Sequence, residues 1–242
     1  AMLCAVLAGL LAGTVTGLLH VLLGIPPILA GILTQMVLWS VNLKILGKAN
    51  QALPARSIDV LLTQMNIPAA LPVLLGWAAV LVTLLVLFFS TELGCALRAT
   101  GCNPVMSRAQ GVNTGLMKVI GLALSNAVVA MSGGLLCQYQ GYTDVNMGRG
   151  AVVIGLAAVV IGQAVLGRHG GHMAAQLGGV VLGAVIYYIV YQVIIFAGFD
   201  TDLLKMFSAV VVAVFLGVPH VRDQIRTNSR IKKGGSRHAE NA

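Results

Sequence analysis

At residues 96–113 the chain reads ALRATGCNPVMSRAQGVN, a polar segment set between two apolar runs of membrane-spanning length. A connection between two spans needs only a few polar residues, but this one carries the signals of a short helix. Asn103 is a good N-cap, and Pro104 suits the first helical position, where its missing N–H costs nothing. Gly111 can adopt the left-handed turn that ends a helix. We therefore predict a short helix between Asn103 and Gly111.

One face of this helix is predicted to be apolar. Val105, Met106 and Ala109 fall on the same side at helical spacing, whereas Arg108 and Gln110 point elsewhere. A small apolar face of this kind suits a groove on a partner protein.

Residues 96–113 resemble the cytoplasmic coupling loop in the permease subunits of bacterial ABC importers of the branched-chain amino acid and ribose type. The family pattern is A-L-R-A-T-G-x-N-P-x-x-A-R-x-x-G-I-N, and this chain departs from it only at Ser107 and Val112. The resemblance implies that a loop at about residues 92–115 docks on an ATPase subunit. The residues that carry this coupling would be Arg98, Asn103, Pro104, Val105, Met106, Arg108, Ala109 and Gly111.

Two other segments, Ile25–Thr34 and Gly155–Gly162, look most like a subgroup whose members are thought to carry tryptophan or related amino acids. The resemblance extends to about Pro219. It implies a small amino acid-like solute rather than a sugar. It also implies ATP-binding subunits, an extracytoplasmic solute-binding protein and a second permease copy as partners. Because the family has more membrane sequence before this point, we expect one or two upstream helices to be missing.

Composition requires a lipid environment. Hydrophobic residues make up 58% of the 242 residues, charged residues only 9%, and the mean hydropathy is +0.92. Soluble domains carry about 25% charged residues. We therefore predict an all-α, polytopic transmembrane helical bundle with short or broken helices. The predicted full spans are Met2–Leu23, Leu71–Ser90, Leu116–Gln138, Gly150–Gly167 and Met173–Phe199, and two runs, Ile28–Val41 and Met206–Val218, are predicted to be too short to cross.

The placement of the basic residues orients this bundle in the plasma (inner) membrane. With residues 96–113 in the cytoplasm, ten of the 15 lysines and arginines lie inside, as the positive-inside rule requires. We expect a permease domain over residues 1–219. A basic, disordered cytoplasmic tail over residues 220–242 is expected to contact anionic lipid. The net charge of +8 thus reflects topology and not nucleic-acid binding.

Polar residues inside spans are costly in lipid and usually face protein or water. Six of them are candidates to line a translocation path: Thr34, Gln35, Ser125, Asn126, Gln163 and Gln192. The alternative for each is a hydrogen bond between helices with no contact to solute. Two interpretations are likewise open for Tyr187, Tyr188 and Tyr191. They could stack on an aromatic substrate, or they could pack between helices or lie at the membrane interface.

The sequence offers no site for catalysis, for a metal or for a cofactor. The four cysteines lack metal spacing, His169 and His172 lack carboxylate or thiolate companions, and Gly47-Lys48 lacks the glycine of a phosphate-binding loop. ATP would therefore be bound by partner subunits. The competing interpretation is a self-contained channel or secondary carrier, although ion-coupled carriers commonly need an acidic residue inside a span, and this chain has none there.

Overall fold

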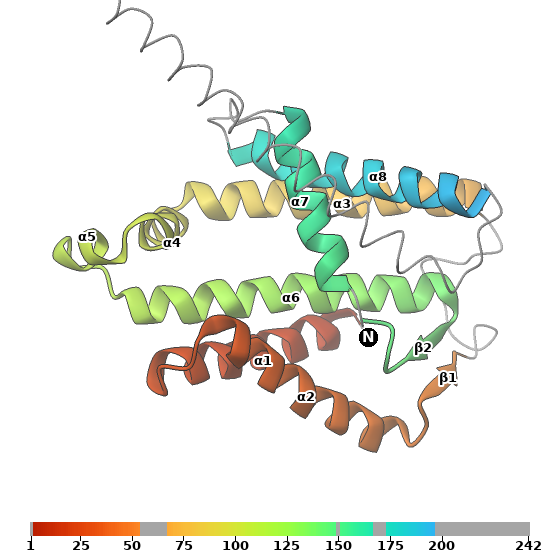
Figure 1. The fold of residues 1–242 in the computed structure, drawn as a ribbon, viewed down its shortest axis with the longest axis horizontal. Helices are drawn as coiled ribbons and strands as arrows, with labels where there is room; N and C mark the ends of the chain where they lie inside the picture. Colours follow the sequence, from red (N-terminus) through yellow and green to blue (C-terminus); the bar gives the residue numbers. More distant parts are fainter. Residues whose placement is uncertain (1, 54–66, 149–150, 167–172, 197–242) are drawn as a thin grey trace, which may run out of the picture. The chain divides into compact units, whose positions relative to one another are not determined.

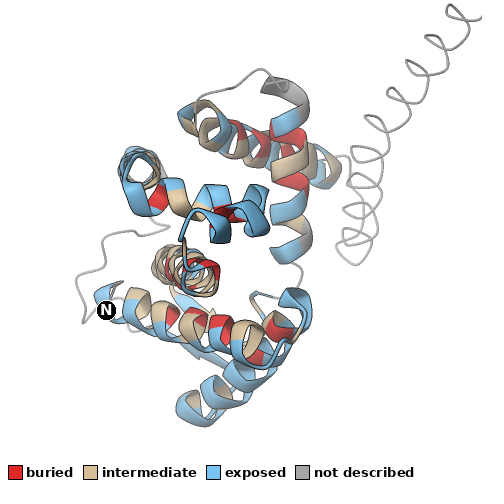
Figure 2. Cartoon of the chain, turned by 90° about the vertical axis from the view of Figure 1, so that its left-hand side faces the viewer, coloured by how far each residue is buried: buried red, intermediate tan, exposed pale blue. Residues whose placement is uncertain are grey.

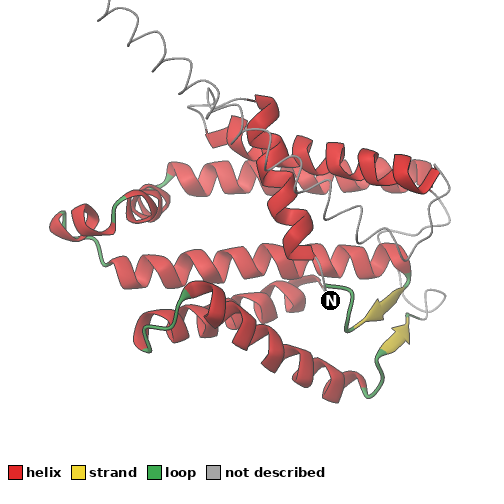
Figure 3. Cartoon of the chain, viewed as in Figure 1, coloured by secondary structure: helices red, strands yellow, loops and turns green. Residues whose placement is uncertain are grey.

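The computed structural model describes residues 2–53, 67–148, 151–166 and 173–196. Contacts divide the chain into two compact units, residues 1–147 and 148–242. Almost every described element is a helix (Figure 1, Figure 3), so the prediction of an all-α bundle is confirmed. In chain order the elements are α1 (Met2–Leu22), α2 (Pro27–Leu46), β1 (Asn50–Ala52), α3 (Ile67–Ser90), α4 (Glu92–Cys102), α5 (Pro104–Ala109), α6 (Thr114–Gln140), β2 (Tyr142–Asp144), α7 (Ala151–Leu166) and α8 (Met173–Phe196).

The first unit is organised around the antiparallel helices α1 and α6. They approach so closely that a Cβ on Gly13 would lie 2.5 Å from the Leu122 carbonyl oxygen and 2.6 Å from the Ala123 Cα. Gly9 and Gly17, about one turn to either side, meet α6 in the same way. Lipid gives two helices no hydrophobic drive to associate, so close contact through small residues holds such a pair together. The glycine stripe of α1 is therefore its packing face, which is also where its buried residues lie (Figure 2).

Helix α2 is longer than the sequence indicates. The apolar run Ile28–Val41 predicts a segment too short to cross, but the helix has 20 residues. Pro27 occupies its first turn, and Gly47 ends it in the left-handed conformation with φ 68°. The helix continues past the apolar run because polar residues are tolerated in a last turn, where Lys44 lies close to the free carbonyl groups. The prediction of a short segment is wrong here.

Helix α7 covers 16 residues inside the predicted span Gly150–Gly167, whose two end residues lie outside the described residues. The helix packs against α8 through Gly162 and Gly183, each of which lies against the backbone of the other helix.

Five described helices are long and apolar enough to cross a membrane: α1, α2, α3 over Leu71–Ser90, α6 and α8. This is the pattern of a multi-pass membrane protein. The predicted short segment Met206–Val218, the tail over residues 220–242, and the pair His169 and His172 lie outside the described residues.

A two-stranded antiparallel sheet, which the sequence did not predict, joins the connections after α2 and α6. Asn50 pairs with Asp144, and Ala52 pairs with Tyr142. The strands were not predicted because each has only three residues and pairs with a strand that is remote in the sequence. The pairing places the ends of α2 and α6 at one end of the first unit, and α4 and α5 lie at the other end (Figure 1).

Replacing Gly13 with alanine is expected to force α1 away from α6, because the new Cβ would overlap the α6 backbone. Overpacking of this kind costs about 1–3 kcal/mol. The unfolding temperature of the detergent-solubilised protein is therefore expected to fall by several degrees. Gly133→Ala on α6 is the matched control, since no atom lies within 4 Å of the position of its Cβ. Equal unfolding temperatures of the two variants would contradict the glycine contact.

Candidate functional site

Asn103 ends α4 and begins α5. Its side-chain oxygen accepts hydrogen bonds from the backbone N–H groups of Val105 and Met106, both at 3.1 Å. Its own N–H donates to the Ala99 carbonyl at 2.9 Å, and Pro104 occupies the first position of α5. The capping that the sequence predicts for Asn103 and Pro104 is confirmed. Because one residue serves both helices, the angle between them is fixed by short hydrogen bonds.

The predicted apolar face of α5 points away from the rest of the first unit. Val105 is 77% exposed, Met106 is 61% exposed, and Ala109 is also exposed. On the opposite side Ser107 is buried, with its hydroxyl donating to the Asn103 carbonyl at 2.9 Å. The helix therefore presents two large apolar side chains outward from a backbone that is well anchored.

The turn after α5 has the left-handed glycine that the sequence predicts. Gly111 has φ 83°, and the Val112 N–H donates to the Ser107 carbonyl at 3.0 Å. Asn113 then begins α6 by accepting a hydrogen bond from the Leu116 N–H at 3.1 Å. Two asparagine caps thus fix both ends of the short segment.

Arg108 fastens α5 to the start of α6. Its Nε donates to the Thr114 hydroxyl at 2.9 Å, and Thr114 is buried. Arg98, by contrast, is exposed on α4. Both guanidinium groups carry positive charge at the α4–α5 end of the unit, but only Arg108 has a structural partner in the described chain.

Helix α4 was not predicted as a separate element. Its start is signalled by Thr91, whose hydroxyl accepts from the Gly94 N–H at 3.3 Å, followed by Glu92 in the first turn. Leu97 packs over Gly121 of α6, where a glycine Cβ would lie 3.0 Å from the leucine Cδ1. This contact joins α4 directly to the helix that follows α5.

His20 joins the turn between α1 and α2 to α6. Its Nδ1 lies 2.7 Å from the Ile25 carbonyl oxygen, and its Nε2 lies 3.4 Å from the Lys118 ammonium nitrogen. A carbonyl can only accept and an ammonium can only donate, so Nδ1 carries the hydrogen and Nε2 accepts. The contact brings the α1–α2 turn to the first turns of α6, next to the α5 segment.

The first candidate path residue, Thr34, is buried between helices. Its hydroxyl accepts from Thr16 of α1 at 2.9 Å and donates to the Ala30 carbonyl at 2.9 Å. This is the interhelical hydrogen bond that the sequence left open as the alternative. Gln35, the next residue, is exposed on α2. Neighbouring residues therefore have different surroundings, since Thr34 is bonded to α1 and Gln35 is exposed.

Ser125 and Asn126 lie on α6, opposite the middle of α1. Ser125 is exposed, whereas Asn126 is half-buried and donates to the Leu122 carbonyl at 2.9 Å. The Asn126 Cβ is 2.9 Å from the Cβ position of Gly13. Thr34 and Asn126 thus both meet α1, one from α2 and the other from α6.

Gln163 on α7 and Gln192 on α8 are both exposed, but they lie toward opposite ends of their helix pair. Gly162 meets Gly179, so Gln163 lies near that level of α8. Gln192 is thirteen residues further along α8, about 20 Å at the helical rise. The structure does not bring these two glutamines into one site.

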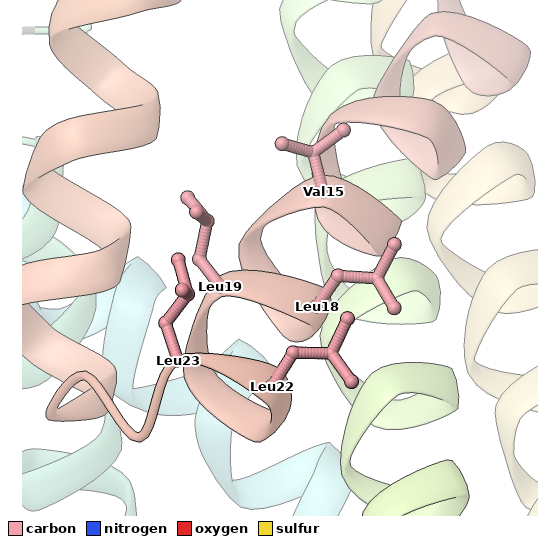
Figure 4. Close-up of a pocket in the computed structure, with 5 residues that line it drawn as sticks. All are labelled: Val15, Leu18, Leu19, Leu22 and Leu23. Carbon is pink, nitrogen blue, oxygen red and sulfur yellow. The ribbon is translucent and has the colours of Figure 1, made fainter.

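An apolar groove on α1 is lined by Val15, Leu18, Leu19, Leu22 and Leu23 (Figure 4). No polar side chain lines it, so it suits an acyl chain or another helix better than a polar solute. Among the described residues no group of three or more His, Cys, Asp or Glu side chains could hold a metal.

Comparison with known proteins places these features in a family. The family described as "Branched-chain amino acid transport system / permease component" matches residues 1–219. The tyrosine transport system permease protein of Clostridioides difficile (strain R20291) is 35% identical over 233 residues, which are 96% of this chain and 77% of the relative.

A second relative is the autoinducer 2 import system permease protein of Escherichia coli (strain K12 / DH10B). It is 31% identical over 182 residues, which are 71% of this chain and 50% of that protein. No solved structure matches the chain.

Proposed function

We propose that this chain, which belongs to the family of branched-chain amino acid transport permease components, forms the translocation path of an ATP-driven importer. The proposed solute is small and amino acid-like. The family is a non-catalytic membrane component of ABC transporters, and its members bind no cofactor. Its partners include ATPase subunits and binding-protein subunits. ATP is then held by the ATPase subunits.

The exposed apolar face of α5 is the observation that carries this proposal. Val105 and Met106 are large, apolar and mostly exposed on a helix whose two ends are fixed by Asn103 and Gly111. A rigid apolar face outside the membrane suits docking in a groove on an ATPase subunit. Arg98 adds an exposed charge on the preceding helix α4, which favours a partner surface with acidic groups.

The distribution of charge supports the proposed orientation of the chain. The α4–α5 end of the first unit carries Arg98, Arg108 and Lys118, and in the proposal it faces the cytoplasm. The β1–β2 end then faces outward in the plasma (inner) membrane, where a solute-binding protein would deliver its cargo. The paired strands support this arrangement, since helices that cross alternately must bring the ends of α2 and α6 to the same side.

The proposed complex contains two copies of this permease, so that two ATPase subunits each receive one α5 helix. Residues 1–219 form the permease domain in this proposal. In the proposal residues 220–242, which lie outside the described residues, contact anionic lipid on the cytoplasmic side, and the charges of Arg222, Arg226, Lys232 and Lys233 support this.

Contacts within the first unit offer a route from α5 to the membrane. Arg108 ties α5 to Thr114 of α6, and the glycines of α1 lock that helix to α6. Thr16 then links α1 to Thr34 of α2. Closure of the ATPase subunits would displace α5 and, through these packed helices, switch the path between outward and inward access.

An amino acid-like solute is favoured by the relatives. The tyrosine permease is similar over nearly the whole chain, and the autoinducer permease over a smaller share. A sugar permease is the alternative within the family. A self-contained channel or secondary carrier is the alternative outside it, and the described spanning helices contain no Asp or Glu to couple to an ion.

The orientation predicts opposite labelling of two engineered cysteines in a cysteine-free background. Gln51→Cys, on exposed strand β1, is expected to react with an impermeant thiol reagent in intact spheroplasts. Gln110→Cys, exposed at the end of α5 and outside its apolar face, is expected to react only after lysis. The reverse pattern would place α5 outside the cell and contradict the proposal.

Docking through α5 predicts that Met106→Glu abolishes ATP-driven uptake. An unpaired carboxylate buried in a contact costs several kcal/mol, and each 1.4 kcal/mol is about tenfold in affinity. The amount of folded protein is expected to be unchanged, because Met106 is largely exposed. Uptake and copurification of the ATPase subunit are the two measurements.

Gln110→Glu is the matched control for Met106→Glu. It adds the same charge at an exposed position that ends α5 outside the apolar face, so uptake is expected to persist. Full uptake by a well-expressed Met106→Glu protein would rule out docking through this face.

A further inference from the structure

Helix α8 carries three tyrosines, and the ring of Tyr187 contacts the rings of Tyr188 and Tyr191. Tyr187 is almost fully buried and packs with Ala157 and Ile161 of α7. Its ring lies edge-on to Tyr188, with centroids 5.8 Å apart and planes at 83°, and stacks on Tyr191 at 6.4 Å and 20°. The buried ring therefore holds two neighbouring rings in defined orientations.

Tyr188 of this cluster and the neighbouring Gln192 form an open face with polar groups. Tyr188 is 57% exposed, and Gln192, one helical turn further on, is exposed on the same side. Within the described residues, neither side chain makes a hydrogen bond to another part of the chain. A phenol hydroxyl and a primary amide are thus both available to a ligand.

The depth of this face argues against contact with lipid alone. Helix α8 has 24 residues, and Tyr188 lies about 5 Å and Gln192 about 11 Å from its middle at the helical rise. With α8 centred in the bilayer, both positions fall inside a hydrocarbon core about 30 Å thick. An amide and a phenol facing acyl chains at this depth would lose hydrogen bonds to water without replacement.

The position also distinguishes the cluster from an interfacial belt of aromatic residues, which lies at helix ends. Packing against α7 accounts for Tyr187, but it does not account for the exposed ring of Tyr188 or for Gln192. A ligand with an aromatic ring and a polar group, bound in the solute path, would contact the Tyr188 ring and form hydrogen bonds with the Gln192 amide.

We infer that Tyr188, Tyr191 and Gln192 form a subsite for the aromatic ring and polar group of a transported amino acid. The inference rests on the proposed transport function and specifies its solute class. The solute ring packs against Tyr188 and Tyr191, which are held by the buried Tyr187. The Gln192 amide exchanges hydrogen bonds with the amino or carboxylate group of the same solute.

The test compares uptake of phenylalanine and leucine by the complete complex reconstituted in vesicles, because these solutes differ mainly in the ring. Tyr188→Leu is expected to raise the KM for phenylalanine by roughly three- to tenfold, the range of aromatic pair energies. The KM for leucine and the kcat are expected to be unchanged. Tyr188→Phe keeps the ring and is expected to keep the preference for phenylalanine.

Two further variants complete the experiment. Phe196→Leu removes an almost fully exposed ring at the end of the same helix and is expected to leave both KM values unchanged. Tyr191→Leu removes the ring stacked on Tyr187 and is the second selective variant if Tyr188→Leu does not assemble.

The possible results separate the subsite from the proposed function. Equal changes for phenylalanine and leucine, or no change for either, in Tyr188→Leu and Tyr191→Leu would overturn the subsite and leave ATP-driven transport intact. Absence of ATP-driven uptake of both amino acids by the unaltered complex would instead overturn the proposed solute class, and the subsite with it.

Discussion

The close contact of α1 with α6 is the interaction on which the rest of the first unit depends. Because Gly9, Gly13 and Gly17 bring the two backbones together, α1 can bind α6 on one side and α2 on the other. The Thr16–Thr34 hydrogen bond then fixes α2, and the His20–Lys118 contact fixes the turn between α1 and α2. In lipid, such small-residue and polar contacts replace the hydrophobic drive of a soluble core.

The α5 segment is rigid for a different reason. It has only six residues, too few for a helix to be stable alone. The Asn103 oxygen nevertheless accepts hydrogen bonds at its start, and Arg108 donates from its last turn to Thr114 of α6. Those bonds lie within the segment or on the first residues of α6. In the proposed importer a displacement of α5 would pass to α6 and, through the glycine contact, to α1. This chain would then contribute the mechanical linkage, and its ATPase partners would contribute the chemistry.

Local chemistry made part of this structure predictable. The cap at Asn103 and the left-handed Gly111 depend on residues close in sequence, and both were predicted from the sequence. Long-range contacts were not predictable in the same way. The strand pairing of Asn50 with Asp144 and the bond of Thr34 to Thr16 depend on how helices meet. Helix length was misjudged at α2 because hydropathy stops at Val41, whereas backbone hydrogen bonding continues to Leu46.

The central claim is that this chain forms a solute path driven by ATPase subunits bound at α5. The most direct measurement is accumulation of labelled amino acid by vesicles that contain the permease, with and without the ATPase subunits and ATP. The account predicts accumulation against a gradient only when both ATPase subunits and ATP are present. Flux of the same solute through the permease alone, unchanged by adding them, would contradict it.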